Sequence, residues 1–389
     1  MITKLIPETI LEYLEENPKV GRKTLAKRFS IPEQVSRHYI WVFREISKGM
    51  TSITVKENLS AIEQLKLEAE RLIRKEIKKP CRIGHLSRKT NLSKEIVVEI
   101  LQKIEKETGL PIEIDKGSVT INKLMSSTIE PINLKELYRN HLKIGLVSDT
   151  HFGSKYQQPK LLHSGYKIME DEGVDFVTNS GDLSDGSPTM HVGIMHEQFI
   201  HTFEEHCDYI TEFYPKSKYF KTYIRPGNHD YSWVKSNAGD PVRVVCKNRD
   251  DLIYVPPANS AFKDKFDNVL VELFHPSGGL PYAKSYRGQK LYEGAVSSAL
   301  SEYHKSQNIE LPQILAIGHL HQFDHFIQGY TNVILLPCFQ SQTPYLKNKG
   351  LSPMVGFVII DIYFDDEGYI YKTSQQIYNL GKQIKEKDF

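Results

Sequence analysis

The sequence predicts an α/β protein preceded by a separate helical region. From residue 143 onward, short apolar runs typical of buried strands alternate with stretches of helical period. Several of these runs end abruptly in polar residues, as at the stretch 144–153. Before residue 140, helical segments and tight turns dominate. A chain of 389 residues is long for one domain, so we expect two or three.

Residues 1–50 show the pattern of a helix-turn-helix module. Helices are expected at 6–17, 24–29 and 33–46, with a tight turn before the last one. In such modules the last helix enters the major groove of DNA. The side chains that we expect to contact nucleic acid there are Arg37, His38 and Arg44. The alternative is a small helical bundle that binds protein.

Residues 61–125 repeat this pattern and add a hairpin, as in a winged-helix module. A charged helix at 61–79 precedes a second helix-turn-helix, and β-prone segments flank the turn 115–118. The last helix, 93–107, carries more glutamates than lysines, so it suits a protein partner better than a DNA groove. The wing and the basic residues at 75–82 could still contact phosphates.

Charge and cysteine usage limit the possible partners and compartment. Residues 1–140 hold 26 Lys and Arg against 19 Asp and Glu, whereas the remainder holds 24 against 29. A polyanionic partner should therefore meet the front part first. The four cysteines are widely spaced, no signal-peptide core follows Met1, and no apolar run reaches 18 residues. We expect a cytoplasmic protein without a membrane span.

Five expected strands end in residues that can bind metal. The clusters are Asp149-Thr150-His151, Gly181-Asp182-Leu183-Ser184-Asp185, Gly227-Asn228-His229-Asp230, His275, and Gly318-His319-Leu320-His321. If the chain stayed extended, Asp149 and His151 would leave on the same face and could hold one ion. A glycine precedes several ligands, which would let the backbone turn sharply. Asp, Asn and His together suit manganese, iron or zinc better than calcium, and there are enough of them for two ions.

This set of clusters resembles the calcineurin-like metallophosphoesterase superfamily, whose pattern is DxH, GDxxD, GNHD, a lone His and GHxH. All five blocks are present without substitution, and the resemblance covers about 143–375. It implies a four-layer α/β/β/α sandwich over 143–375, followed by a tail at 376–389. It also implies two divalent ions. Manganese is the expected metal, with iron, zinc or nickel as alternatives.

The resemblance further assigns a role to each site residue. One ion would be held by Asp149, His151 and His321, the other by Asn228, His275 and His319, and Asp182 would bridge them. His229, oriented by Asp230, would stabilise the phosphate or protonate the leaving oxygen. Asp185 would support the ligands from outside.

The superfamily does not fix the substrate, which must be argued from other features. The basic front favours DNA. Aromatic and cationic residues at 278–291, including Tyr286 and Arg287, and at 339–347 could stack bases and hold phosphates, although ordinary loop packing is the alternative. We expect a DNA exonuclease or structure-selective nuclease, similar in chemistry to DNA-repair exonucleases of the superfamily. The alternatives are a protein phosphatase or nucleotide phosphodiesterase with a protein-binding front, and a DNA-binding regulator with incidental activity.

Overall fold

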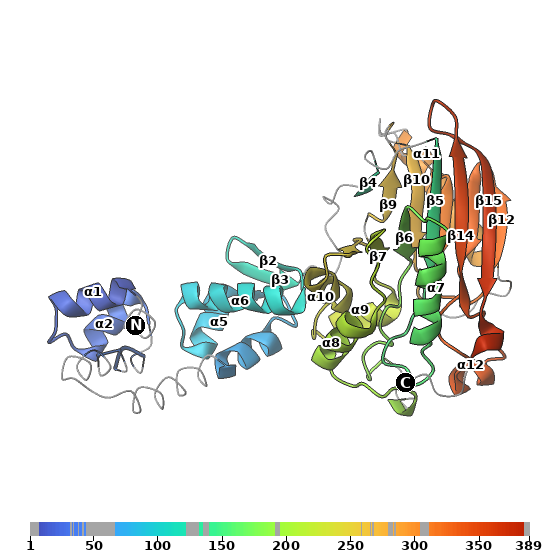
Figure 1. Cartoon of the computed structure of the whole chain (residues 1–389). Coiled ribbons are helices and arrows are strands. Elements are labelled where there is room, and N and C mark those ends of the chain that lie inside the picture. The colour runs from blue at the N-terminus through green and yellow to red at the C-terminus, as the bar shows by residue number, and fades with distance from the viewer. Residues whose placement is uncertain are drawn as a thin grey trace. The chain divides into compact units, whose positions relative to one another are not determined.

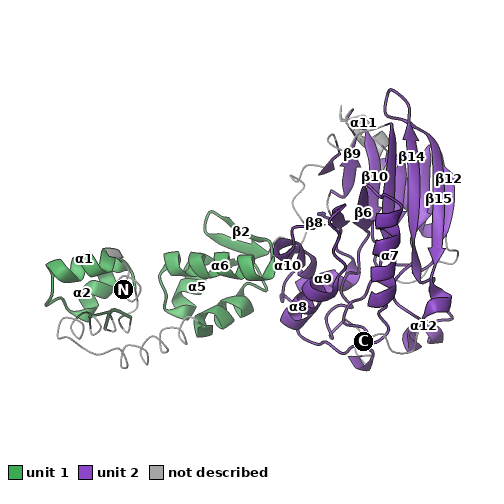
Figure 2. Cartoon of the chain, viewed as in Figure 1, with its two compact units in different colours: residues 1–122 green, residues 123–389 purple. Residues whose placement is uncertain are grey.

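The computed structural model divides into two compact units, residues 1–122 and 123–389 (Figures 1 and 2). The structure describes residues 8–31, 33, 35–37, 39–40, 43, 67–121, 132–134, 140–190, 195–257, 259–264, 266, 268–278, 283, 285–303 and 311–384. None of the helices within these ranges is long and apolar enough to cross a membrane.

The first unit begins with α1 (Glu8–Glu16) and α2 (Arg22–Phe29). The helix α2 ends at Ser30, whose left-handed φ of 51° reverses the chain. The described residues of the expected third helix are helical, and they include the exposed Arg37. His38 and Arg44 lie outside the described residues. The shared apolar core consists of Ile10, Leu14, Leu25, Ile31, Tyr39 and Ile40.

The second half of this unit has the helices and the hairpin expected of a winged helix. The helices are α5 (Ile83–Thr90) and α6 (Lys94–Thr108), and β2 (Ile112–Asp115) pairs with β3 (Ser118–Ile121) across the predicted turn. A third strand, β1 (Cys81–Arg82), pairs with β3 and was not predicted. Two residues are too few to show a strand period, which explains the omission.

Charged residues of α6 pair within the same unit. The Nζ of Lys103 lies 3.0 Å from an Oε of Glu70, and the guanidinium of Arg74 lies 3.3 Å from Glu107. Glu70 is nearly buried, and its burial opposes ionisation, yet the hydrogen bonds and charges of Arg74 and Lys103 lower its pKa. Part of the acidic surface of α6 is therefore neutralised by a neighbouring helix of the same module.

The second unit contains two six-stranded sheets. The first has the order β15-β14-β5-β6-β7-β8. Its strands are β5 (His141–Val147), β6 (Phe176–Asn179), β7 (Thr222–Ile224), β8 (Leu252–Tyr254), β14 (Gly356–Phe364) and β15 (Ile370–Asn379). The strands β5 to β8 run parallel.

The second sheet has the order β12-β13-β11-β10-β9-β4. Its strands are β4 (Ile132–Asn133), β9 (Ala261–Lys263), β10 (Val269–Phe274), β11 (Ile314–Ile317), β12 (Asp324–Gln328) and β13 (Thr331–Leu335). The strands β10, β11 and β13 run parallel.

Alternating side chains place the two sheets face to face. Along β5, Leu142, Ile144 and Leu146 enter a core shared with β10 and β11, whereas Val147 enters a core shared with helices. Helices cover the outer faces (Figure 1), so the unit is the expected α/β/β/α sandwich. These helices are α7 (Pro159–Asp171), α8 (Phe203–Phe213) and α10 (Pro241–Asn248) over the first sheet, and α11 (Tyr286–Tyr303) over the second.

The carboxyl-terminal boundary predicted at residue 375 is wrong. The strand β15 pairs with β14 as far as Asn379, opposite Gly356, and a short 3-10 helix (Gly381–Gln383) follows. The predicted partner of β14 around Tyr369–Lys372 was therefore only the beginning of a longer strand. An edge strand faces solvent on one side, so its residues are largely polar. The residues around 376 therefore lack the apolar run from which a strand would have been predicted.

Candidate metal centre

Every predicted metal ligand follows the carboxyl end of a strand. Asp149 and His151 follow β5, Asp182 follows β6, Asn228 begins the helix α9 (Asn228–Lys235) after β7, His275 follows β10, and His319 and His321 follow β11. The carboxyl ends of neighbouring parallel strands meet at one edge of a sheet. Each sheet thus delivers ligands to the same edge of the sandwich, and the structure brings all seven together.

A first cluster consists of Asp149, His151 and His321. The Nε2 of His321 lies 3.2 Å from the Oδ1 of Asp149 and 3.1 Å from the Nε2 of His151. One ligand atom of each residue lies within 4.8 Å of the others. All three side chains are buried. Such a buried, convergent set of carboxylate and imidazole groups can hold a divalent cation.

A second cluster consists of Asp182, His275 and His319, joined by Asn228. The Nε2 of His275 lies 3.0 Å from an Oδ of Asp182 and 3.1 Å from the Oδ1 of Asn228. The same Asp182 oxygen lies 3.9 Å from the Nε2 of His151 in the first cluster. Asp182 is therefore placed between the two clusters, where a carboxylate can bridge two ions.

Three of the candidate histidines have their second ring nitrogen fixed by an acceptor. The Nδ1 of His151 lies 2.9 Å from the carboxylate of Asp185, and the Nδ1 of His275 donates to the carbonyl of Ser180 at 2.8 Å. The Nε2 of His319 donates to the carbonyl of Gly278 at 2.9 Å. A carbonyl can only accept, so the other nitrogen keeps its lone pair. This arrangement is typical of metal-binding histidines, and it fits the expected ions.

The backbone at the site is left-handed at most of the ligands. Nine non-glycine residues among those described have a positive φ, and five of these are candidate ligands: Asp149 (53°), His151 (46°), Asp182 (52°), His319 (78°) and His321 (54°). The expectation that an extended chain presents Asp149 and His151 is therefore wrong. Each residue instead donates its backbone N–H to the loop after β6, at Gly181 and Asp182. Backbone strain of this kind concentrates at functional sites.

The glycines before the ligands serve two different purposes. Gly181 has a φ of 114° and turns the chain as expected. Gly227 has a φ of −99°, and Gly318 is not among the residues with positive φ, so neither is required by a left-handed turn. A Cβ at Gly227 would meet the Asp182 carboxylate, and one at Gly318 would lie 2.9 Å from the His275 ring. These two glycines let strand ends approach one another closely, which corrects the prediction of a sharp turn.

Residues 142–323 match a family model described as calcineurin-like phosphoesterase. This segment is a calcineurin-like phosphoesterase domain. Its five motif blocks are the ones whose side chains form the two clusters. This family implies a metal-dependent phosphoester hydrolase, although it does not specify the ester.

Solved structures with a similar fold share little sequence with the chain. An archaeal phosphodiesterase is 14% identical, with a TM-score of 0.30, over 61% of this chain and 100% of its own. A putative 5′-nucleotidase from Staphylococcus aureus is 14% identical, with a TM-score of 0.37, over 61% of this chain and 54% of its own. Vps29 from Entamoeba histolytica is 11% identical, with a TM-score of 0.28, over 61% of this chain and 100% of its own. No protein among the curated sequences matches the chain.

The charges of the phosphoesterase site are strongly coupled. Burial opposes the ionisation of Asp149 and Asp182, but nearby histidines hold the pKa of each carboxyl well below its usual range. Burial likewise opposes the charged form of His151, yet hydrogen bonds to Asp149 and Asp185 raise its pKa to about 9. Protons on His151 and His321, whose pKa despite burial is also raised by Asp149, therefore balance the carboxylates. Metal binding would displace these protons.

The predicted role of Asp230 is wrong, whereas that of Asp185 fits the contacts. The carboxylate of Asp230 accepts hydrogen bonds from the backbone of Leu183, Ser184 and Gly227 and from the Ser184 hydroxyl, and it does not reach the His229 ring. The His229 ring is instead held by its Nδ1, which donates to the carbonyl of Asp185 at 2.8 Å. Asp230 therefore ties the loops after β6 and β7 together.

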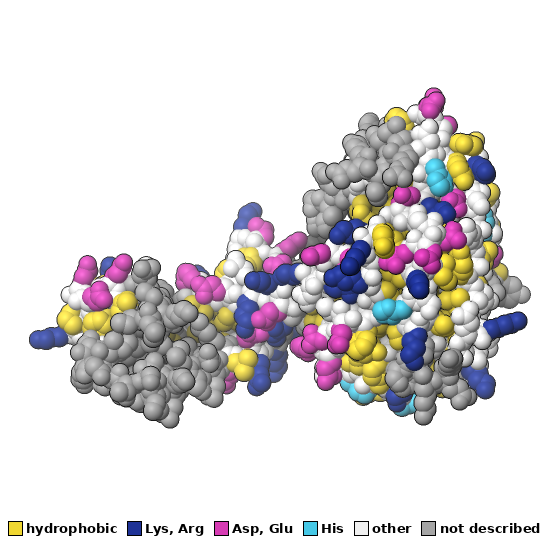
Figure 3. Space-filling model, in the orientation of Figure 1, with side chains coloured by type: hydrophobic (Ala, Val, Ile, Leu, Met, Phe, Trp, Pro, Cys, Tyr) yellow, Lys and Arg dark blue, Asp and Glu magenta, His cyan; other side chains and the backbone are white. Residues whose placement is uncertain are grey.

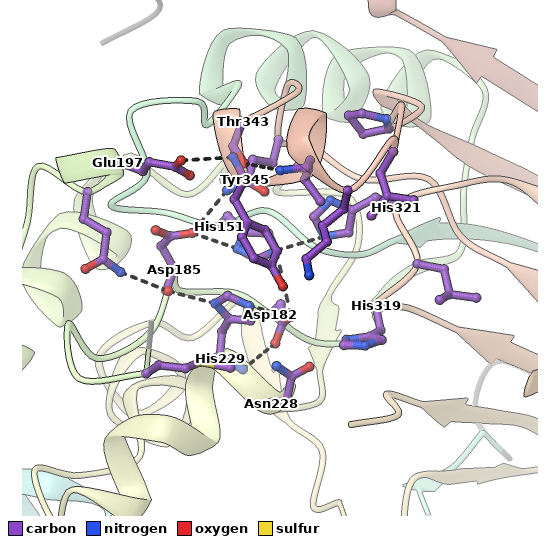
Figure 4. Close-up of a pocket in the computed structure, with 18 of the residues that line it drawn as sticks. His151, Asp182, Asp185, Glu197, Asn228, His229, His319, His321, Thr343 and Tyr345 are labelled. Atoms are coloured by element: carbon purple, nitrogen blue, oxygen red, sulfur yellow. Dashed lines mark hydrogen bonds and ion pairs between the residues drawn. The ribbon is translucent and has the colours of Figure 1, made fainter. Parts of the chain in front are cut away.

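A pocket of about 530 Å³ opens over the phosphoesterase site (Figure 4). It is lined by candidate ligands of both clusters and by His229. Sequence reasoning missed part of its wall, notably Met195, Glu197, Lys349 and Leu351. Tyr345, within the predicted 339–347 segment, also lines it. These residues come from loops far apart in the chain, so no local motif could indicate them.

The predicted nucleic-acid contacts that the structure describes belong to different units. Arg37 belongs to the first unit. Tyr286 and Arg287 begin α11, where the Arg287 guanidinium donates to the carbonyl of Ser277 at 2.9 Å, close after His275. Neither Tyr286 nor Arg287 lines the pocket. Their contact with nucleic acid stays a prediction.

Proposed function

We propose that this protein is a two-metal phosphodiesterase that cleaves DNA, with its amino-terminal modules holding the nucleic acid. The observation that carries the proposal is the position of Asp182 between two ligand clusters, beside a pocket that also contains His229. When bound, two divalent ions supply Lewis-acid catalysis by polarising the phosphoryl group and lowering the pKa of water. Asp149, His151 and His321 would hold one ion, and Asn228, His275 and His319 the other.

His229 is the residue best placed to act on the phosphoester itself. Because its Nδ1 donates to a carbonyl, the Nε2 is the nitrogen that can exchange a proton. This Nε2 lies 3.9 Å from Asp182 and belongs to a pocket-lining side chain. A proton on Nε2 would stabilise the negative charge on the phosphate and could pass to the leaving oxygen.

The first unit supports a DNA substrate through its architecture more than through its charge. Two helices joined by a turn at Ser30, with Arg37 exposed on the second, are suited to a groove. Figure 3 shows Lys and Arg interspersed with Asp and Glu over the visible face, without a uniformly basic area. Binding would therefore rest on a few phosphate contacts, and its salt dependence would be correspondingly shallow.

The decisive experiment assays the purified protein with Mn²⁺ on labelled single- and double-stranded DNA and on bis(p-nitrophenyl) phosphate. Cleavage of all three supports the proposal, whereas cleavage of the small diester alone rejects a nuclease. In the same assay, an Arg37→Ala, Arg44→Ala variant should lose DNA affinity and keep diester activity. Lys382→Ala, which removes an exposed cation from the second unit, is the matched control.

A nucleotide phosphodiesterase with a protein-binding front is the second candidate. It is favoured by the charge pairing within the second module, because Lys103 and Arg74 are engaged with glutamates of the same module and are less available to contact phosphates. It is also favoured by the size of the pocket, which suits one small ligand. Hydrolysis of nucleotide diesters without DNA cleavage would select this candidate.

A further inference from the structure

A one-turn helix, α12 (Pro344–Asn348), forms one rim of the pocket and is held firmly in place. The Thr343 hydroxyl accepts a hydrogen bond from the backbone of Leu346 at 3.1 Å. The buried Glu197 accepts one from the backbone N–H of Tyr345, also at 3.1 Å. The carbonyl of Glu197 in turn accepts the N–H of Lys155, on the loop that carries His151. The rim is thus tied to the ligand loops.

Two side chains of this rim differ from the rest of the pocket wall. Tyr345 keeps 39% of its surface exposed although it lines the pocket. In Figure 4 its ring projects from the rim toward His151 and Asp182. The ammonium of Lys349 lies 5.8 Å from the centre of that ring. Among the described residues that line the pocket, Lys349 is the only Lys or Arg.

The composition of the wall limits the ligand. Met190, Met195, Leu346 and Leu351 add apolar surface to the wall of the pocket that Tyr345 also lines. A nucleic-acid strand that passed through the pocket with consecutive phosphates would need a row of cations. The described part of the pocket wall has a single Lys or Arg, Lys349. An aromatic ring can stack on a base, and a cation beside a two-metal centre can hold a phosphate. The pocket therefore suits a ligand with one phosphate and one base. The volume of about 530 Å³ is in the range that takes a single small ligand.

We propose that Tyr345 stacks on the nucleobase next to the scissile phosphate and that Lys349 pairs with a phosphate oxygen, so that the centre accepts a terminal nucleotide. This inference rests on the proposed function and narrows it to cleavage at strand ends or of short nucleotide diesters. It also gives the 339–347 segment a defined role.

The test compares substrates that differ only in the base. Thymidine 3′- and 5′-(p-nitrophenyl phosphate) are assayed beside their abasic tetrahydrofuran counterparts, with the full-length protein and Mn²⁺. The wild type should prefer one thymidine ester over its abasic form by roughly tenfold to a hundredfold in kcat/KM. Tyr345→Ala should abolish that preference and Tyr345→Phe should keep it. Because each protein is compared with itself, a general loss of folding cannot imitate the result.

Lys349 is tested through the phosphate, which both substrates share. Lys349→Gln should raise KM for thymidine and abasic esters alike, by about tenfold for one lost charge contact. Lys347→Gln, in the last turn of α12 two residues before Lys349 but not part of the pocket wall, should change neither. An unchanged KM in Lys349→Gln would overturn the assignment of that lysine.

The outcomes separate this inference from the proposed function. A base preference that survives Tyr345→Ala, or a wild type without any base preference, overturns the stacking role even if DNA is cleaved. A Tyr345-dependent preference on the small esters without cleavage of DNA rejects the nuclease and leaves the nucleotide subsite standing.

Discussion

Replacing Gly227 with alanine isolates the close approach that positions the bridging carboxylate. The φ of −99° suits alanine, so the backbone conformation itself adds no strain. The new methyl would overlap the Asp182 side chain and would lie 2.8 Å from its Cγ. Carbon atoms normally remain about 3.5–4.0 Å apart, so Asp182 or the loop must move by about 1 Å.

The consequence should appear in turnover more than in folding. A displacement of that size at a reacting centre costs about a hundredfold in rate. Overpacking of a dense interior lowers the free energy of unfolding by about 1–3 kcal/mol. We therefore expect Gly227→Ala to reduce kcat on bis(p-nitrophenyl) phosphate about a hundredfold and to weaken Mn²⁺ binding in calorimetry. Its melting temperature should fall by only a few degrees.

A matched glycine provides the control for this substitution. Gly294 lies in α11, and a Cβ there would meet nothing within 4 Å. Gly294→Ala should keep full activity and gain up to about 1 kcal/mol from helix propensity. Wild-type turnover and Mn²⁺ affinity in Gly227→Ala would refute the reasoning, because they would show that Asp182 does not depend on this contact.

Three further substitutions test the site and the frame around it. Asp182→Asn should abolish turnover, and retained activity would rule out the bridging role. Asp185→Asn should weaken Mn²⁺ affinity or activity by about 10–100-fold, measured by calorimetry and diester hydrolysis, since Asp185 fixes the Nδ1 of His151; an unchanged affinity and rate would contradict this. Asp251→Asn breaks a buried pair with Arg249 (2.7 Å) and should cost about 3–5 kcal/mol at pH 7 in urea unfolding. Burial opposes ionisation of Asp251, but Arg249 lowers its pKa. The stability that the Asp251–Arg249 pair contributes is therefore present above about pH 4 and is lost as the pH falls below it. If the variant were still less stable than the wild type by the same amount at about pH 2, the ion pair could not be the cause.

The convergence of the seven candidate ligands could be predicted because each signal is local. An apolar strand followed by Asp, Asn or His is visible within about ten residues, and parallel strands bring such ends together. The left-handed backbone could not be predicted in this way. The positive φ of Asp149 accompanies a hydrogen bond to Gly181, on a different strand end, and the residue type alone does not reveal that partner.

The misassigned role of Asp230 has an equally physical cause. Adjacency in the sequence suggested that Asp230 orients His229, but both residues lie in the first turn of α9. Consecutive helical side chains point in different directions and do not face each other. The pocket rim could not be predicted for another reason. Glu197 and Tyr345 are in contact but lie 148 residues apart in the chain, so no local pattern connects them.

The left-handed ligands have a consequence for how this sequence can change. Each of the five positions has a backbone that glycine adopts freely and that a residue with a Cβ adopts at a cost of about 1 kcal/mol or more. Asp and His tolerate it better than most residues, but not as well as glycine. Selection for a more stable fold would therefore favour replacing them with glycine. Glycine at any of the five positions would relieve this backbone cost but would remove a candidate metal ligand, so stability and metal binding make opposite demands there.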